Sequence, residues 1–108
     1  MLNIDRIAVL ESAISVFGLR SRKDIAIEEM SELTKALLKE RRAKTKIERA
    51  EARANIIEEI ADVYIMLQQL IMIYDKEGEC QSAVDYKVDR LEQTVLEALE
   101  EEIQNGIF

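Results

Sequence analysis

Two short acidic motifs in this sequence have the residue types and the spacing that a metal site needs. Residues 28–33 read EEMSEL and residues 58–63 read EEIADV, and in each motif an acid follows the second glutamate by three residues. On a helix, residues three apart are neighbours separated by about 4.5 Å along the axis. Each motif would therefore present two carboxylates on one helical surface. Together they supply four candidate ligands for a hard divalent cation: Glu29, Glu32, Glu59 and Asp62.

The sequence neighbours of these four acids place them toward the apolar sides of their helices. Glu29 has Ile25 one turn before it and Leu33 one turn after it, and Glu59 follows Ile56 by three residues. The first acid of each motif lies at a polar edge instead. Carboxylates that are clustered on an apolar face are costly unless they are neutralised. We therefore expect nearby cationic side chains, protonation of some of the acids, or a bound metal ion.

A metal ion suits this acidic cluster better than the lysines that follow it. Lys35 and Lys39 come next on the same predicted helix, but neither lies squarely on the acidic face. Mg²⁺ best fits a donor set made only of carboxylates, with Mn²⁺ as an alternative. The chain has no histidine, which disfavours zinc and the Glu-x-x-His sites of di-iron bundles. Because a single ExxE motif is usually a solvated acidic surface, the residues alone leave both interpretations open.

The elements that must position these acids are all predicted to be helices. The 108 residues include no proline and only three glycines, and they are rich in residues that favour helices. Apolar residues recur at intervals of three and four residues in four segments. Capping patterns and glycines bound the predicted helices at residues 7–17, at 21–43, from 46 or from 56 to 77, and from 82 onward. We expect a single all-α domain, residues 1–108, with the helices packed as a four-helix bundle.

Charge, cysteine content and hydropathy limit the classes of partner and compartment. The net charge of −7 argues against a protein that binds nucleic-acid polymers, although residues 35–53 carry eight Lys/Arg against three Glu. One cysteine, Cys80, fits a reducing compartment. No segment has the roughly 20 apolar residues of a membrane span, and the first eighteen residues have no signal-peptide core. The sequence thus predicts a cytoplasmic protein that does not contact membranes. The third helix is apolar on most faces, so we also expect self-association.

The acidic motifs resemble those of a known family. EExxE at residues 28–32, followed by ExxD at residues 59–62, is similar to the MazG-like all-α nucleoside triphosphate pyrophosphohydrolases, which are related to dimeric dUTPases and phosphoribosyl-ATP pyrophosphohydrolases. Lys87 and Arg90 on the fourth predicted helix resemble the phosphate-binding K-x-x-R pair of that family. The resemblance covers roughly residues 20–95. It implies hydrolysis of a nucleoside triphosphate between the α and β phosphates, to the monophosphate and pyrophosphate, in the cleansing of the nucleotide pool.

The resemblance also implies roles for individual residues. Glu29, Glu32, Glu59 and Asp62 would hold Mg²⁺ against the phosphates of the substrate. Glu28 would position the attacking water, and Lys87 and Arg90 would stabilise charge on the phosphates. Lys39 and Arg42 are weaker candidates for binding phosphate, and a solvated basic helix end explains them equally well. The family further implies a dimer or a tetramer.

Several alternatives remain open at the level of sequence. The base and sugar of the substrate are not predicted, nor is the group that activates the water. A phosphoribosyl-ATP pyrophosphohydrolase, a pseudoenzyme that binds nucleotide without cleaving it, and a non-catalytic helical interaction module are the competing functions.

Overall fold

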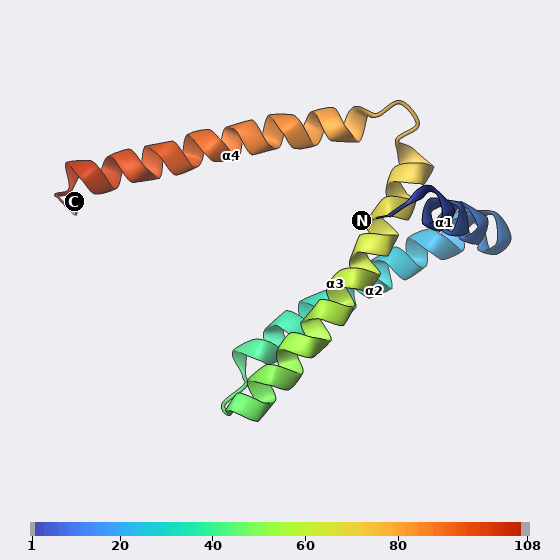
Figure 1. Cartoon of the computed structure of the whole chain (residues 1–108), viewed down its shortest axis with the longest axis horizontal. Coiled ribbons are helices and arrows are strands. Elements are labelled where there is room, and N and C mark those ends of the chain that lie inside the picture. Colours follow the sequence, from blue (N-terminus) through green and yellow to red (C-terminus); the bar gives the residue numbers. More distant parts are fainter. Residues whose placement is uncertain (1, 107–108) are drawn as a thin grey trace. The chain divides into compact units, whose positions relative to one another are not determined.

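A computed structural model describes residues 2–106, which form four α-helices and no β-strand (Figure 1). The helices are α1 (Ile4–Phe17), α2 (Leu19–Arg41), α3 (Lys46–Tyr74) and α4 (Glu79–Gln104). The all-α prediction is confirmed. The chain divides into two compact units, of which the first ends at Tyr74 and contains α1 to α3, and the second begins at Asp75 and contains α4. Within the described residues, none of the helices has a stretch long and apolar enough to cross a membrane.

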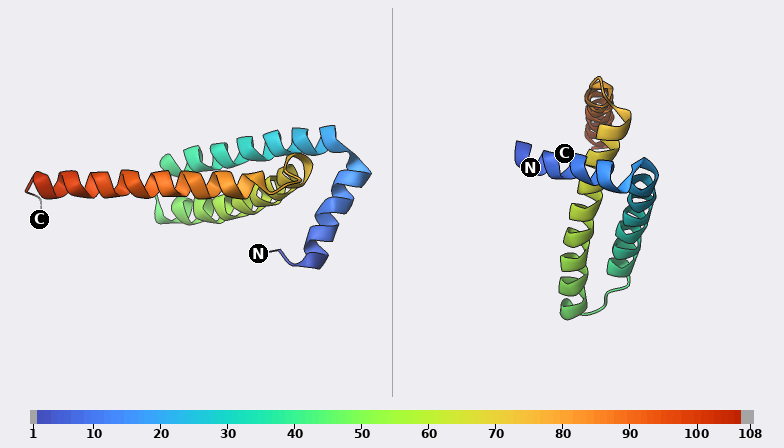
Figure 2. Two further views of the ribbon diagram at one scale, coloured as in Figure 1. Left: turned by 90° about the horizontal axis from the view of Figure 1, so that it is seen from above. Right: turned by 90° about the vertical axis from the view of Figure 1, so that its right-hand side faces the viewer.

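Helices α2 and α3 form an antiparallel hairpin, and α1 crosses it where α2 begins and α3 ends (Figures 1 and 2). The hairpin turn is short because Thr45 caps α3: its hydroxyl oxygen accepts a hydrogen bond of 3.0 Å from the backbone amide of Glu48. In return, the Glu48 carboxylate accepts a bond of 2.9 Å from the amide of Lys44. Of the two predicted starts of the third helix, the one near residue 46 is therefore correct.

Only Gly18 separates α1 from α2. Its backbone, at φ 91° and ψ 157°, lies in a region that is accessible essentially to glycine alone. Its amide donates to the carbonyl of Ile14 at 2.9 Å, and its carbonyl accepts from the amide of Arg22 at 3.2 Å, so one residue ends the first helix and starts the second. The predicted start of the second helix at the capping box of Ser21 and Asp24 is wrong, because both residues already lie inside α2.

Small residues form much of the core between α2 and α3. Ala26 and Ala36 on α2 and Ala52 on α3 are buried, and alanine allows two helix backbones to approach closely. The larger buried side chains of the first unit are Leu10, Ile56, Met66 and Gln69. Most of these core positions belong to α3, the helix that the sequence predicts to be apolar on most faces.

A buried glutamine connects the three helices of the first unit. Gln69 of α3 is only 1% exposed, and its amide nitrogen donates to the backbone carbonyl of Leu10 in α1 at 3.1 Å. Its amide oxygen accepts from Nε of Arg22 in α2 at 3.2 Å. The Arg22 guanidinium also lies 5.5 Å from the ring centre of Phe17 and 3.7 Å from the sulfur of Met66. Both the amide nitrogen and the amide oxygen of Gln69 therefore have hydrogen-bond partners where the three helices meet.

The second unit begins with a cap made by Asp75. Its carboxylate accepts hydrogen bonds from the backbone amides of Glu79 at 2.7 Å and Cys80 at 2.8 Å, which satisfies the first turn of α4. The predicted start of the fourth helix at Ser82 is wrong, because Asp75 and the left-handed Gly78 begin the helix one turn earlier. Whether α4 completes a four-helix bundle stays a prediction.

Candidate metal centre

Three of the predicted metal ligands meet across the α2–α3 hairpin. Glu29 of α2 and Glu59 and Asp62 of α3 each offer a carboxylate oxygen, and these oxygens lie within 4.8 Å of one another. Glu29 and Glu59 are half-buried, whereas Asp62 is exposed. We call these three residues the acidic trio. Its open side makes it accessible to a ligand from solvent.

The local sequence explains why these acids come together. On α2, the buried Ala26 lies one turn before Glu29, and on α3 the buried Ile56 lies one turn before Glu59. Each glutamate therefore continues the packed face of its helix by one turn. The three-residue spacing then adds Asp62 beside Glu59 on the same side of α3. Packing of the apolar face forces the carboxylates toward each other.

The electrostatics of the trio are those of an uncompensated negative cluster. Burial raises the pKa of Glu29, and the charges of Asp62, Glu59 and Glu28 and a hydrogen bond with Asp62 raise it further. Burial also raises the pKa of Glu59, followed by the charges of Asp62, Glu32 and Glu58. Each glutamate therefore binds a proton more readily than an ordinary glutamate does. A positive charge at the site would stabilise these carboxylates.

One carboxylate oxygen has no partner within the described part of the chain. Oε2 of Glu59 is buried and accepts no hydrogen bond. A buried charged oxygen without a partner is costly, and few such atoms occur in native proteins. Together with the oxygen-only donors of the trio, this atom fits a hard divalent cation such as Mg²⁺.

The fourth predicted ligand, Glu32, lies beside the trio but is not a member of it. Its charge contributes to the raised pKa of Glu59, so its carboxylate lies near that group. Its Oε1 instead pairs with Nζ of Lys35 at 3.3 Å, an ion pair whose lysine side chain is 71% exposed. Exposed pairs of this kind are weak, so the carboxylate can turn toward a metal at little cost. Glu28, the predicted water-positioning residue, is exposed next to Glu29.

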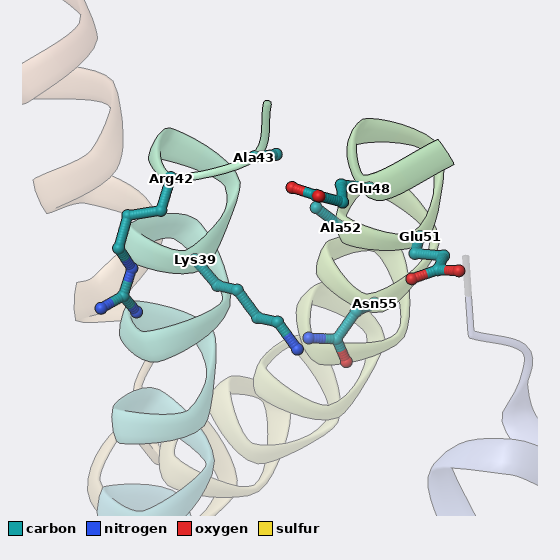
Figure 3. A pocket seen from close by; sticks show the side chains of 7 residues that line it. All are labelled: Lys39, Arg42, Ala43, Glu48, Glu51, Ala52 and Asn55. Atoms are coloured by element: carbon teal, nitrogen blue, oxygen red, sulfur yellow. The ribbon is translucent and has the colours of Figure 1, made fainter. Parts of the chain in front are cut away.

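The predicted basic residues Lys39 and Arg42 line a pocket at the hairpin end of α2 and α3. This hairpin pocket has a volume of about 400 Å³ (Figure 3). Its lining residues are Lys39, Arg42, Ala43, Glu48, Glu51, Ala52 and Asn55. In Figure 3 the Lys39 side chain extends from α2 toward Asn55 of α3, whereas the Arg42 side chain turns away from α3. Of the two basic residues, Lys39 is the one directed across the pocket.

Lys87 and Arg90 lie one turn apart on α4, in the second unit. With Leu91 and Thr94 they line a shallow depression of about 230 Å³ on that helix. The Arg90 guanidinium lies 5.9 Å from the ring centre of Tyr86. Their role in binding phosphate, which the family resemblance implies, stays a prediction.

Two features of the first unit are missing from the predictions. The Gln69–Arg22 connection joins residues 47 positions apart, and the only signal for it is an amide pair, Gln68-Gln69, within the most apolar run of the chain. The alternative helix start at residue 56 would make Asn55 a helix cap, but Asn55 lies well inside α3 and lines the hairpin pocket.

No protein-family model, curated protein sequence or solved structure matches this chain. The site is therefore interpreted from its own residues and their chemistry.

Proposed function

We propose that this chain is a Mg²⁺-dependent nucleoside triphosphate pyrophosphohydrolase, which releases the nucleoside monophosphate and pyrophosphate. The observation that carries the proposal is the acidic trio, with its carboxylate oxygens within 4.8 Å and with one buried oxygen of Glu59 lacking a partner. The order of the acidic motifs and the K-x-x-R pair adds the phosphate chemistry through the family resemblance. Removal of modified nucleotides from the cytoplasmic pool is the role that we propose.

The residues divide into three groups by their proposed roles. Glu29, Glu59 and Asp62 would hold the metal, and Glu32 could join them on release from Lys35. Mg²⁺ bound there would neutralise charge on the substrate phosphates and make the α-phosphorus more susceptible to attack.

Glu28 orients the attacking water, which its exposed position beside Glu29 favours. Lys87 and Arg90 stabilise the negative charge that is left on the departing pyrophosphate. The absence of histidine from the chain leaves carboxylates as the side chains best suited to accept the proton of the water.

We further propose that the chain self-associates, as a dimer or a tetramer, and that α4 contributes to a four-helix bundle. Large apolar side chains on the outer sides of α3 support this part of the proposal. Ile57 is 50% exposed and Ile60 is 52% exposed, although isoleucine is among the residues most often buried. Sedimentation equilibrium of the purified chain measures the oligomeric state, and a monomer at all micromolar concentrations would contradict this part.

The test of the activity is a panel of triphosphates assayed for pyrophosphate release with and without Mg²⁺. We expect release that depends on Mg²⁺ and is lost in Glu59→Gln and in Asp62→Asn. Glu58→Gln is the matched control, because Glu58 is an exposed acid that adjoins Glu59 and lies outside the trio. The proposed site would be refuted if Glu59→Gln and Asp62→Asn released as much pyrophosphate as Glu58→Gln.

The remaining outcomes of the panel separate the competing functions. Selective hydrolysis of phosphoribosyl-ATP would assign the chain to that reaction instead. Nucleotide binding without pyrophosphate release would indicate a pseudoenzyme. A lack of both, with a melting temperature that does not respond to Mg²⁺, would favour a helical interaction module.

A further inference from the structure

The hairpin pocket lies next to the acidic trio along the same pair of helices. On α3, Asn55 precedes Glu59 by four residues, which corresponds to about 6 Å along the helix axis. On α2, Lys39 follows Glu29 by ten residues, in the same direction toward the hairpin turn. A ligand bound at the trio can therefore extend into the pocket without leaving the α2–α3 surface.

The lining of the pocket combines two small apolar side chains with polar groups. Ala52 is only 7% exposed, and Ala43 is half-buried at the opposite side. The amide of Asn55 and the ammonium group of Lys39 also line the pocket and point toward each other between the two helices (Figure 3). Sites for small organic ligands combine apolar surface with a few placed hydrogen-bonding groups, in volumes that include the 400 Å³ of this pocket.

The charge of the pocket disfavours a second phosphate site. Glu48 and Glu51 both line it, and they oppose the one lysine that is directed across it. A triphosphate tail would meet like charges there, whereas a neutral, flat, polar group would not. Lys39 is therefore better placed to contact the edge of an uncharged ligand group than to bind a phosphate, the role predicted from the sequence.

Asn55 is a free hydrogen-bonding group at this position. Its side chain is half-buried, and within residues 2–106 it makes no hydrogen bond. Asparagine is also an unfavourable residue inside a helix, so Asn55 does not stabilise α3 through its helix propensity. A side-chain amide has adjacent donors and an acceptor, which match the paired donors and acceptors on the edge of a nucleobase.

From these observations we infer that the hairpin pocket binds the base of the nucleotide substrate, with Asn55 hydrogen-bonded to the base edge and Ala52 beneath the ring. The inference rests on the proposed function for its choice of ligand. With the base in the pocket, the phosphates extend toward the acidic trio.

The test uses nucleosides, which have a base and a sugar but no phosphate and no need of metal. In ¹H–¹⁵N and methyl NMR spectra of the full chain, the four common nucleosides and deoxyuridine are titrated to millimolar concentration. We expect at least one to shift the Asn55 side-chain amide and the Ala52 methyl signal. Asn55→Ala should weaken that binding by about 10-fold, the loss of one good hydrogen bond. Arg53→Gln, an exposed change two residues away, should leave it unaltered.

Failure of this inference and failure of the proposed function give different results. If no nucleoside shifts the Asn55 and Ala52 signals, or if Asn55→Ala binds as well as the wild type, the base-binding role is refuted even where triphosphates are hydrolysed. If nucleosides shift those signals but no triphosphate yields pyrophosphate, the pocket stands and the catalytic proposal fails. For an active enzyme, Asn55→Ala should lower kcat/KM for the preferred triphosphate about 10-fold, but not for ribose 5-triphosphate, which has no base.

Discussion

Replacement of the buried Gln69 by leucine should destabilise the first unit by about 2–3 kcal/mol. Leucine fills a similar volume, so the main loss is that of two hydrogen bonds. The bond to the Leu10 carbonyl is neutral and buried, and a bond of this kind contributes about 1 kcal/mol. The bond from Arg22 is assisted by charge but partly exposed, which places it near the lower end of about 1.5–3 kcal/mol. The Leu10 carbonyl keeps its partner within α1, so no large penalty for an unsatisfied group is added.

Urea unfolding followed by circular dichroism at a fixed protein concentration measures this effect. Gln68→Leu is the matched control, because Gln68 adjoins Gln69 but is only half-buried and makes no hydrogen bond within the described residues. It should change the free energy of unfolding by less than about 0.5 kcal/mol. In a double-mutant cycle with Arg22→Met, we expect a coupling of about 1–2 kcal/mol. Equal effects of the two leucine substitutions, or additivity with Arg22→Met, would refute the assigned role of Gln69.

Three further predictions concern the trio and the hairpin turn. Because the pKa values of Glu29 and Glu59 are raised above 4.5 in the folded chain, their stabilising contribution is complete below that pH and is lost as the pH rises through the folded values. The urea midpoint of the metal-free protein should therefore fall with rising pH more in the wild type than in Glu59→Gln, and a steeper fall in the variant would contradict this. Mg²⁺ should raise the melting temperature by binding the native state, by the equivalent of about 2.7 kcal/mol at 100 times Kd. Asp62→Asn should abolish that rise and stabilise the metal-free protein, whereas a lower metal-free melting temperature would indicate a structural role for Asp62. Thr45→Ala should cost about 1 kcal/mol in urea unfolding, because it removes the cap of α3, and an unchanged midpoint would show that the cap is dispensable.

Interactions within one helix could be predicted from the sequence. The side-by-side placement of Glu59 and Asp62 follows from a helical period alone. The cap that Thr45 provides for Glu48 has the same local origin. So does the Glu32–Lys35 pair, although the sequence analysis placed Lys35 to one side of the acidic face. In each case the partners are three residues apart, so helix geometry determines the contact once the helix exists.

Contacts between helices, and the competition between caps, could not be predicted in this way. The approach of Glu29 to Glu59 depends on the length of the hairpin turn, and the sequence offered two starts for α3. The Gln69–Leu10 bond spans 59 residues and has no periodic signal. The capping boxes at Ser21 and Ser82 failed because Gly18 and Asp75 start their helices earlier, and a local pattern does not show which of two adjacent caps prevails.

The short turn between α2 and α3 also has a kinetic consequence. Segments that are close in sequence close their loops at low entropic cost, so a hairpin with a turn of residues 42–45 is expected to pair early in folding. The pairing extends outward from the turn, and Glu29 meets Glu59 and Asp62 once it reaches the middle of α2. We therefore expect their repulsion to be present in the folding transition state, before a cation can bind at the completed site. The residues proposed to hold the metal are therefore expected to slow the folding of the chain, and neutralising one of them should increase the folding rate.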